Sequence, residues 1–437
     1  MSLLHEAHAL APALTALRHA LHREPELGLA LPLTQARILA ALDGLGLEIR
    51  TGEALSSVTA VLRGGRPGPA VLLRGDMDAL PVQEDTGLPY ASELDGRMHA
   101  CGHDLHVTGL VGAARLLAAR REELAGDVVF MFQPGEEGQG GAQIMIDEGV
   151  LDAAGERVVA AYALHVISTG APTGFAATRP GPVLAASDAV DVTVLGRGGH
   201  GSSPHSAADP VPALCAMVTA LQTAVTREID VFDPAVVTVG RIEAGTAANV
   251  IPETAAFSAT VRTFSDDSRA RVRAAFERTV RGVAAAHGVS AEIDYVEQYP
   301  PTVNDAGEAA FALETARQVL GEGHAFEAPK PMAGAEDFSF VLRKVPGAFV
   351  GLGACPPGTD PATAPMNHSA QAVYDDGALP HAAALLAGLA LRRLGAPLAE
   401  AGADSPDGAD SLAEAASVDG AASVDAGAAA SAGSVRE

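Results

Sequence analysis

The sequence predicts an α/β protein in which a larger domain, built on a mainly parallel sheet with helices on both faces, is interrupted by a smaller α+β domain. Three observations predict this. The chain has 437 residues, more than a single hydrophobic core usually spans. Apolar strand-like runs alternate with helical segments in the first part of the chain, as in βαβ units. From about residue 187 a β-α-β-β-α-β order replaces that alternation.

The first part of the chain supplies most of the expected sheet. Residues 3–22 repeat apolar side chains at helical spacing, and Pro25 ends that helix. Short apolar runs followed by polar or acidic residues predict buried strands. The further expected elements are helices at 34–45 and 105–119 and strands at 58–62, 70–73 and 128–132. Ligands bind at the carboxyl ends of strands in open α/β sheets, so we expect a site where those polar residues gather.

The interrupting segment predicts a separately folded domain. Its expected strands are 188–195, 235–242 and 257–263, and its expected helices are 209–227 and 266–287. The α/β pattern returns near residue 299. We therefore predict a larger domain from residues 1–186 and 299–398, with the smaller domain inserted at 187–298. Cys215 lies on the apolar side of its helix and is expected in the core.

Residues 399–437 differ from the rest of the chain in composition. Ala, Ser, Gly and Asp dominate this segment, and large apolar residues are almost absent. Such a segment cannot bury enough apolar surface to offset the entropy that it would lose on ordering. We expect a disordered acidic tail.

The composition also disfavours several classes of function. The chain has 29 basic and 54 acidic residues, a net charge of −25, which disfavours nucleic acid and anionic membrane surfaces as partners. No apolar run approaches the roughly 20 residues that a membrane helix needs, and the N-terminus lacks a signal-peptide pattern. Three cysteines are too few for a disulfide framework. These features predict a cytoplasmic protein.

The segment His-Ala-Cys-Gly-His-Asp, residues 99–104, is the strongest signal for a metal site. It places a thiolate and an imidazole, Cys101 and His103, two residues apart in a loop that contains glycine. Both side chains can then turn toward one divalent ion. The alternative is a chance cysteine and histidine in a loop.

A pair of adjacent carboxylates, Glu136 and Glu137, is the second signal. The pair lies in Gln-Pro-Gly-Glu-Glu-Gly, residues 133–138, directly after the expected strand at 128–132. In a turn flanked by glycine the two side chains can point in different directions. One can bind a metal while the other takes a proton from a metal-bound water. The alternative is a solvated acidic turn.

Two further histidines are weak signals by themselves. His165 interrupts an apolar strand, where a histidine is more often a hydrogen-bonded core residue, and His368 lies in a loop. With the two motifs above they give one cysteine, three histidines and a glutamate pair. That set suffices for two metals that share a bridging ligand, a recurring device for hydrolysis in which the ions lie about 3.5–4 Å apart.

A glycine motif at residues 196–201 favours a different function. It matches the G-x-G-x-x-G pattern of dinucleotide-binding loops and lies between an expected strand and helix. However, Pro204 and His205 separate its last glycine from the helix at 209–227, whereas the third glycine of a dinucleotide fold lies inside the helix start. The motif alone is weak evidence for a dinucleotide-binding oxidoreductase.

Many ordered motifs between about residues 14 and 395 resemble one enzyme family. They include His-Arg-Glu-Pro-Glu-Leu at 22–27, Arg-Gly-Asp-Met-Asp-Ala-Leu-Pro at 74–81, Asn-Val-Ile-Pro at 249–252, Thr-Val-Arg-Thr at 260–263, and the metal-site motifs above. The chain resembles the di-metal amidohydrolases that include hippurate hydrolase, indole-acetyl-amino-acid hydrolase and N-acyl-amino-acid amidohydrolases. More distant relatives are the aminoacylases, carboxypeptidase G and the metallo-dipeptidases.

The resemblance implies a role for each matching residue. Glu136 is similar to the general base, and Asp78 to a carboxylate that orients a ligand. His200 is similar to a residue that reaches a neighbouring subunit's site and stabilises the oxyanion. Asn249, Arg262 and the backbone of Gly334 resemble substrate contacts. The residues similar to the metal ligands, with Cys101 as the bridging one, are Cys101, His103, Glu137, His165 and His368.

The resemblance implies a metal-dependent amidohydrolase that cleaves N-acyl-amino acids by means of a metal-bridging hydroxide. Two divalent ions, Mn²⁺, Zn²⁺ or Co²⁺, suit these ligands. The expected partner is a second copy of the chain, in a homodimer formed through the inserted lid and dimerisation domain. A dipeptidase or carboxypeptidase with the same centre is the alternative. A metal-dependent binding protein is disfavoured because the base and the whole ligand set are present.

Overall fold

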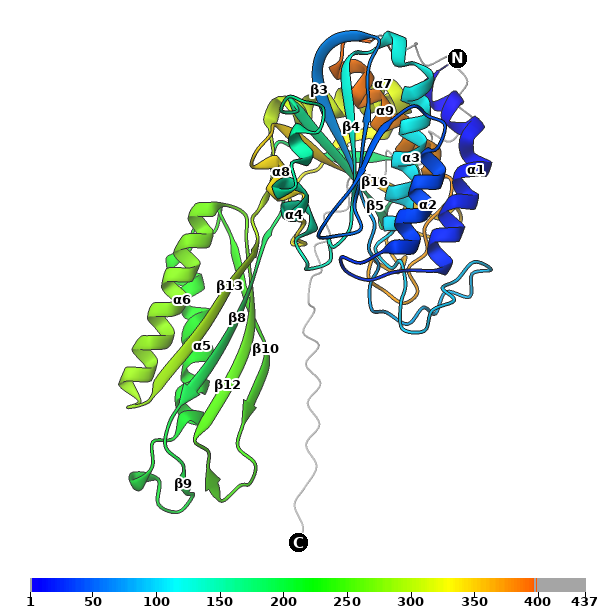
Figure 1. Cartoon of the computed structure of the whole chain (residues 1–437). Helices are drawn as coiled ribbons and strands as arrows, with labels where there is room; N and C mark the ends of the chain where they lie inside the picture. Colours follow the sequence, from blue (N-terminus) through cyan, green and yellow to red (C-terminus); the bar gives the residue numbers. More distant parts are fainter. Residues whose placement is uncertain (1, 397, 399–437) are drawn as a thin grey trace, which may run out of the picture. The chain divides into compact units, whose positions relative to one another are not determined.

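The computed structural model of this chain describes residues 2–396 and residue 398, so the predicted tail at 399–437 lies outside the described residues. Its larger sheet has eight strands (Figure 1) in the order β1-β2-β4-β3-β5-β16-β6-β15. The strands are β1 (Glu48–Thr51), β2 (Val58–Leu62), β3 (Arg66–Asp76), β4 (Ala125–Gln133), β5 (Ala160–Pro172), β6 (Ala176–Thr178), β15 (Ala325–Glu327) and β16 (Gly347–Cys355). The central strands β4, β3, β5 and β16 are parallel to one another, whereas β1 and β2 add an antiparallel edge.

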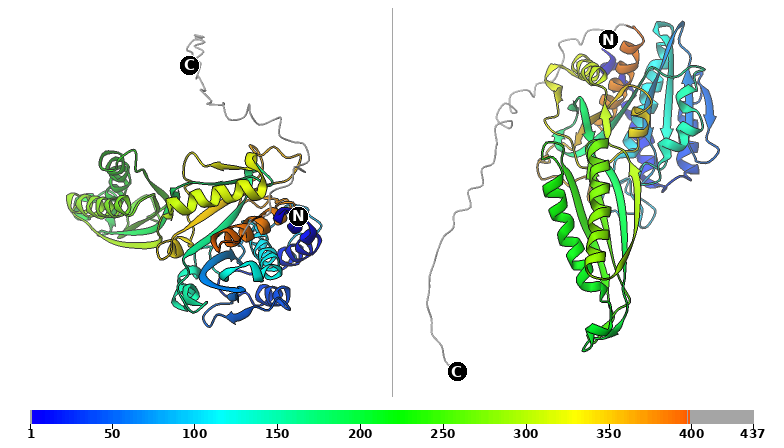
Figure 2. Two further views of the ribbon diagram at one scale, coloured as in Figure 1. Left: turned by 90° about the horizontal axis from the view of Figure 1, so that it is seen from above. Right: turned by 90° about the vertical axis from the view of Figure 1, so that its left-hand side faces the viewer.

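Helices cover both faces of this sheet (Figure 1 and Figure 2). The two-residue period of a strand points Val71 and Leu73 of β3 toward one core and Ala70 and Leu72 toward the other. The helices of the first core are α1 (Leu3–Arg23), α2 (Pro32–Leu42), α3 (His103–Ala119), α7 (Ala306–Leu320) and α9 (Ala378–Arg393). The helices of the second core are α4 (Gly141–Asp147) and α8 (Ser339–Leu342).

A second sheet is formed by the segment that interrupts the large one. Its four antiparallel strands have the order β10-β12-β8-β13. Valines 190, 192 and 194 of β8 are buried in the core of this domain, whereas Asp191, on the opposite face of the strand, is exposed. Along the chain the elements are β8 (Ala186–Leu195), α5 (Pro210–Glu228), β10 (Ala235–Ala244), β12 (Thr254–Thr263), α6 (Asp266–Ala286) and β13 (Ser290–Tyr299).

The predicted fold class is confirmed, since a mainly parallel sheet covered by helices carries a smaller α+β insert. The residues at which the two domains divide stay a prediction. Between them, β7 (Gly181–Leu184) pairs with β14 (Thr302–Asn304) where the chain leaves and re-enters the larger domain. None of the described helices is long and apolar enough to cross a lipid bilayer.

The expectation for Cys215 is wrong, because this side chain is exposed. The buried residues of α5 form a stripe that includes Ala213, Leu214, Met217 and Leu221. Cys215 follows Leu214, one step of about 100° around the helix, and so lies outside the stripe.

Candidate metal centre and active site

The register of the large sheet brings three predicted segments to one edge. Asp76, the last residue of β3, pairs with Gln133, the last residue of β4. On the other side of β3, Arg74 pairs with Ala163 of β5, which places His165 level with Asp76. The loops that carry Asp78 and the glutamate pair therefore begin beside His165, at the carboxyl edge of the parallel strands.

The turn at Gly102 brings Cys101 and His103 to the same edge. Gly102 caps the start of α3 with a φ of 84°, a left-handed conformation that glycine adopts without steric cost. An added Cβ atom would lie 2.5 Å from Cγ2 of Val166. Glycine is therefore required here both for the backbone conformation and for the close approach of β5.

Five predicted residues form two groups that share one sulfur atom. The Sγ atom of Cys101 lies 3.3 Å from Nε2 of His165 and 3.2 Å from Nε2 of His368. Nε2 of His368 also lies 3.3 Å from Oε1 of Glu137. Two of the candidate metal groups contain this sulfur: Cys101 with His103 and His165, and Cys101 with Glu137 and His368.

Hydrogen bonds to the backbone orient two of the imidazoles. Nδ1 of His103 donates to the carbonyl oxygen of Asp78 at 2.7 Å, and Nδ1 of His165 donates to that of Val166 at 2.8 Å. Each ring therefore carries a proton on Nδ1 and directs Nε2 toward the cluster, the orientation that metal-binding histidines commonly have. Nε2 of His103 has no hydrogen-bond partner among the described residues.

Asp78 also holds the glutamate pair. Its two carboxylate oxygens accept hydrogen bonds from the backbone N–H groups of Glu136 and Glu137, each at 3.0 Å. The hydroxyl group of Tyr299 donates to the carbonyl oxygen of Glu136 at 2.8 Å. The peptide that carries both glutamates is thus fixed from two sides.

The electrostatics of the cluster suit metal binding and proton transfer. Burial alone would raise the pKa of the Cys101 thiol, but His165 and His103 hold this pKa well below its usual value, which favours the thiolate. Burial, together with Glu336 and Glu137, raises the pKa of Glu136 well above that of an ordinary glutamate. A carboxylate with a raised pKa is a stronger proton acceptor.

Arg74 is a buried residue of the site to which the sequence motifs assign no role. Its fully buried guanidinium lies 2.5 Å from Asp76, 2.8 Å from Glu336 and 3.2 Å from Asp337. This arginine offsets the negative charge of three buried carboxylates. The pairing of oppositely charged residues about 260 positions apart leaves no local signal in the sequence.

His106 has a structural role beside the cluster. Its Nδ1 atom donates to Asp76 at 2.5 Å, and its Nε2 atom accepts the backbone N–H of Val166 at 2.8 Å. Burial lowers the pKa of His106 to about 4, so the ring is neutral and can make both bonds. The sequence partly predicts that His106 lies near the cluster, because His103 and His106 are three residues apart and face the same side of α3.

The structure does not bring all of the predicted substrate contacts together. His200 lies in β9 (Gly199–His200), which pairs with β11 (Val250–Ile251) at the end of the small sheet beyond Leu195, and Asn249 is adjacent. Arg262 lies at the opposite end of β12, beside Ser187. A strand of this length separates the two ends by about 30 Å. Gly334 is exposed in the loop that precedes Glu336.

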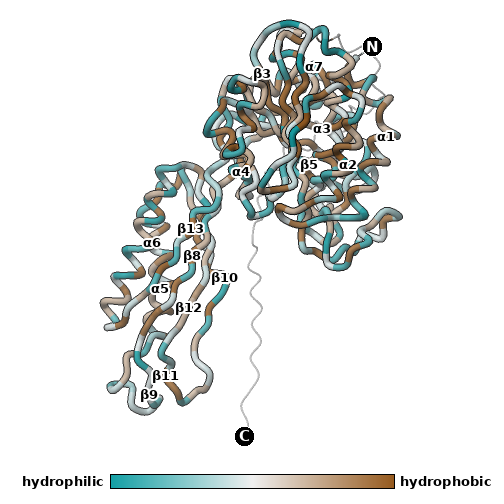
Figure 3. The backbone as a smooth tube through the Cα atoms, viewed as in Figure 1, coloured by the Kyte–Doolittle hydropathy of each residue, from teal (hydrophilic) through white to brown (hydrophobic). Residues whose placement is uncertain are grey.

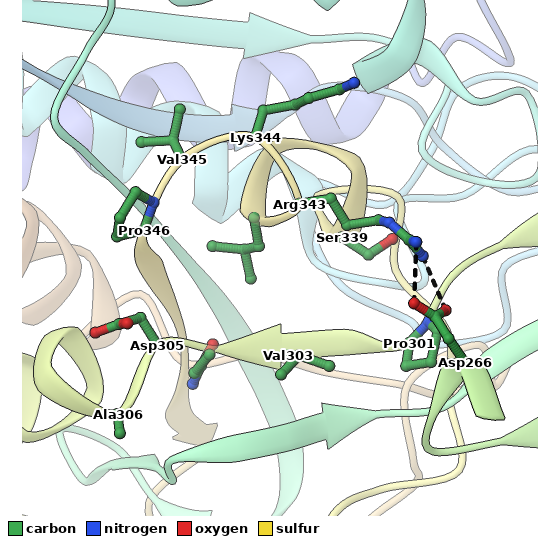
Figure 4. Close-up of a pocket in the computed structure, with 12 residues that line it drawn as sticks. Asp266, Pro301, Val303, Asp305, Ala306, Ser339, Arg343, Lys344, Val345 and Pro346 are labelled. Carbon is green, nitrogen blue, oxygen red and sulfur yellow. Dashed lines mark hydrogen bonds and ion pairs between the residues drawn. The ribbon is translucent and has the colours of Figure 1, made fainter. Parts of the chain in front are cut away.

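Figure 4 shows a cavity, of about 630 Å³, whose lining includes none of the cluster residues. It is lined by residues from α8, β14 and the start of α6, and it contains none of the predicted site residues. Arg343 and Asp266 form an ion pair in it, with N–O distances of 2.9 and 3.0 Å. This cavity is therefore not the site to which the sequence motifs point.

The donor set at the sheet edge fits two divalent ions. One thiolate, three imidazoles and a carboxylate are ligands that Zn²⁺, Mn²⁺ and Co²⁺ accept. The unpartnered Nε2 of the fully buried His103 is the kind of atom that a metal would satisfy. The ligand assignment itself stays a prediction.

Comparison with known proteins shows the family. The model of peptidase family M20/M25/M40 matches residues 72–392. The chain is 38% identical over 339 residues to N-acetylcysteine deacetylase of Bacillus subtilis, covering 77% of this chain and 87% of that protein. It is 37% identical over 382 residues to an IAA-amino acid hydrolase of Arabidopsis thaliana, covering 86% of this chain and 85% of that protein. Its identity to hippurate hydrolase of Campylobacter jejuni is 34% over 394 residues, covering 90% of this chain and all of that protein.

A solved structure supports the same family. A dinuclear metal-binding peptidase of the M20 family from Bacillus subtilis superposes with a TM-score of 0.76 at 32% identity, covering 89% of this chain and all of that chain. The match extends over both sheets of the described chain, and the family resemblance predicted from the motifs is confirmed. This chain belongs to peptidase family M20/M25/M40.

Proposed function

We propose that this chain hydrolyses the amide bond of N-acyl-amino acids with the help of two divalent metal ions. The observation that carries the proposal is the pair of candidate metal groups that share Cys101, with Glu136 beside them at the sheet edge. The relatives named N-acetylcysteine deacetylase, IAA-amino acid hydrolase and hippurate hydrolase support an N-acylated amino acid as the substrate class. The proposed ligands are Cys101, His103, Glu137, His165 and His368.

Glu136 is proposed to move the proton in this reaction. When bound, the two ions would supply Lewis acidity that activates a water molecule and polarises the amide carbonyl. Glu136 accepts a proton from the attacking water and delivers it to the leaving nitrogen. Its raised pKa and its fixed backbone both support that role.

Substrate recognition is proposed to combine residues from two copies of the chain. Arg262 suits a substrate carboxylate because its guanidinium can bind both oxygens, and the backbone of Gly334 offers a further contact. His200 donates a hydrogen bond to the carbonyl oxygen as negative charge develops, and Asn249 lies beside it. Because a strand length separates His200 from Arg262, one copy does not present both residues to one substrate.

A homodimer through the inserted domain would resolve that separation. Strand β10 lies at the edge of the small sheet, so its outer backbone groups have no strand partner among the described residues. Its side chains Val236 and Ile242 are 49% and 55% exposed. An edge strand with exposed apolar side chains is a surface that a second copy can cover.

Peptide hydrolysis is the second candidate function. The chain is 36% identical over 341 residues to thermostable carboxypeptidase 1 of Saccharolobus solfataricus, covering 77% of this chain and 84% of that protein. A carboxypeptidase and an acyl-amino-acid hydrolase differ in what lies on the acyl side of the bond. The same centre could therefore serve either substrate class.

A substrate panel separates the two candidates. Acetyl, benzoyl and indole-acetyl amino acids are compared with unblocked dipeptides and N-blocked dipeptides by measuring the free amino acid released. We expect release from the acyl-amino acids, abolished by a chelator and restored by Mn²⁺, Zn²⁺ or Co²⁺. Preferential cleavage of the dipeptides would favour the peptidase, and turnover that resists chelation would contradict the metal centre.

A further inference from the structure

The side chain of Asn367 joins three segments that carry proposed metal ligands. Its Nδ2 group donates to the carbonyl oxygens of Cys101 at 3.3 Å and Val166 at 3.1 Å. Its Oδ1 atom accepts from the backbone N–H of Ser168 at 3.0 Å, while the hydroxyl of Ser168 donates to the carbonyl oxygen of Pro365 at 2.8 Å. A backbone carbonyl cannot donate and a backbone N–H cannot accept, so these partners fix the orientation of the amide. One carboxamide thus ties the loop of residues 365–369 to β5 and to the loop before α3.

The next residue, His368, has a strained backbone. Among the described residues it is the only non-glycine residue with a positive φ, 73°. That conformation costs an ordinary residue roughly 1 kcal/mol or more and persists only where neighbouring contacts enforce it. The backbone N–H of His368 donates to the carbonyl oxygen of Ala100 at 2.8 Å, while its side chain is 54% exposed. The imidazole is therefore placed mainly by its loop and little by packing.

The other two imidazoles of the cluster are positioned differently. His103 begins helix α3 and is fully buried, and His165 lies within strand β5. Both rings donate from Nδ1 to backbone carbonyl oxygens. The hydrogen bonds of His368 to described residues involve only its backbone N–H and Nε2. Of the three imidazoles, that of His368 depends most on the conformation of its loop.

We infer that Asn367 is a positioning residue that holds His368 in the left-handed conformation required for the group of Cys101, Glu137 and His368. The inference rests on the proposed function, because it uses the proposed ligands. It goes beyond the proposed function because it states that the ligands of the two metal positions are held in place by different parts of the structure. In the group of Cys101, His103 and His165, the two imidazoles lie at a helix start and in a strand. The other group depends on one carboxamide for its third ligand.

Removal of the carboxamide should therefore weaken the binding of one of the two metal ions selectively. In Asn367→Ala we expect the second equivalent of metal to bind about 10–100-fold more weakly, the usual loss when an outer partner of a ligand is removed. Asn367→Asp keeps the acceptor for Ser168 but turns an oxygen toward two carbonyl oxygens, so its loss should be at least as large. Gln371→Ala is the matched control, since this exposed residue lies in the same loop region and its side chain contacts Asp85.

The test is a Co²⁺ titration of the chelated full-length protein. The thiolate-to-cobalt absorption band, metal content after dialysis and thermal unfolding of the metal-free protein are measured together. The inference predicts two equivalents in the wild type and in Gln371→Ala. In both Asn367 variants it predicts one tight and one weakened equivalent, with metal-free unfolding temperatures near that of the wild type.

Other outcomes would overturn the inference. If Asn367→Ala binds two equivalents of Co²⁺ with wild-type affinity, His368 does not need the carboxamide of Asn367 to hold its position. A parallel loss of both equivalents with a large fall in unfolding temperature would show a general structural role. Fewer than two equivalents in the wild type would instead contradict the proposed metal centre itself, whatever the variants do.

Discussion

The two sheets of this chain differ in how many of their faces are covered. The strands of the large sheet send alternate residues into two separate cores, so side chains on both faces are buried. The small sheet packs one face on α5 and α6, and strands β10 and β13 expose most of their other residues. Figure 3 shows the same contrast in hydropathy, with hydrophobic stretches concentrated in the central strands of the large sheet.

This difference explains where each kind of function can lie. A cluster of ligands must be held to within a fraction of an ångström, which a sheet buried on both faces provides. A surface that meets a second copy or moves onto a substrate must instead remain exposed. The proposed ligands and base lie at the carboxyl edge of the first sheet, in β5, at the start of α3 and in neighbouring loops. His200 and Asn249 lie at the tip of the second sheet.

Removing the shared ligand should abolish the metal centre. Cys101→Ser replaces the thiolate that both candidate metal groups use, so we expect loss of bound metal and a fall in kcat/KM of at least about 10³-fold, since each bound metal contributes several kcal/mol. Metal content and turnover are measured on the same preparation. Cys215→Ser, an exposed cysteine of the small domain, is the control and should behave as the wild type. Full metal content in Cys101→Ser would exclude Cys101 as the shared ligand.

A change in the small domain should affect turnover but not metal binding. His200→Ala should lower kcat by about 10²–10³-fold, the usual loss for one oxyanion donor, with metal content unchanged. His205→Ala, another exposed residue of the same segment, serves as the control. Mixing His200→Ala with Glu136→Gln should restore activity if the two residues act from different copies. A mixture as inactive as its components would contradict a site shared between copies.

The helical layer of the large domain contains a buried ion-pair cluster that should make stability depend on pH. Burial alone would lower the pKa of His22, but the carboxylate of Asp104, 2.9 Å from Nδ1, raises it to about 9. Arg18, also fully buried, pairs with the same carboxylate at 3.0 Å. A histidine with a raised pKa stabilises the folded state fully below its unfolded value of 6.5. That contribution is lost as the pH rises through 9.

His22→Gln should therefore lower the free energy of unfolding by roughly 3 kcal/mol below pH 6.5, and the difference from the wild type should shrink toward pH 9. Denaturant unfolding at several pH values measures it. His5→Gln, at an exposed position of the same helix, should leave the curve unchanged. A difference that grows with pH would reverse the assigned direction.

The exposed ion pair between Arg343 and Asp266 should contribute least. Its side chains are 48% and 61% exposed, so water and salt screen the interaction. We expect Arg343→Gln to change the free energy of unfolding by less than about 1 kcal/mol, and high salt should remove even that difference. A loss of several kcal/mol would show that this contact contributes more to the fold than its exposure implies.

The sequence predicted elements and motifs better than it predicted contacts. The apolar run at 128–132 and the glutamate pair after it identify β4 and its loop, because strand ends are local features. β3 is longer than predicted, since Pro67 and Gly68 interrupt the apolar pattern at its start. Arg74 and Glu336, or Asn367 and Ser168, meet only after the sheet has formed. Those partners have no periodic or motif signal, which is why the positioning of His368 emerges from the structure alone.

The most direct test of Glu136 as the general base is the comparison of Glu136→Gln with the wild type, both fully loaded with metal and of measured metal content. The variant keeps the shape of the side chain but cannot accept the proton. We expect two bound ions and a kcat lowered by at least about 10²–10⁴-fold, the range for a general base. Turnover near the wild-type value with both ions bound would contradict the assignment of Glu136 as the base.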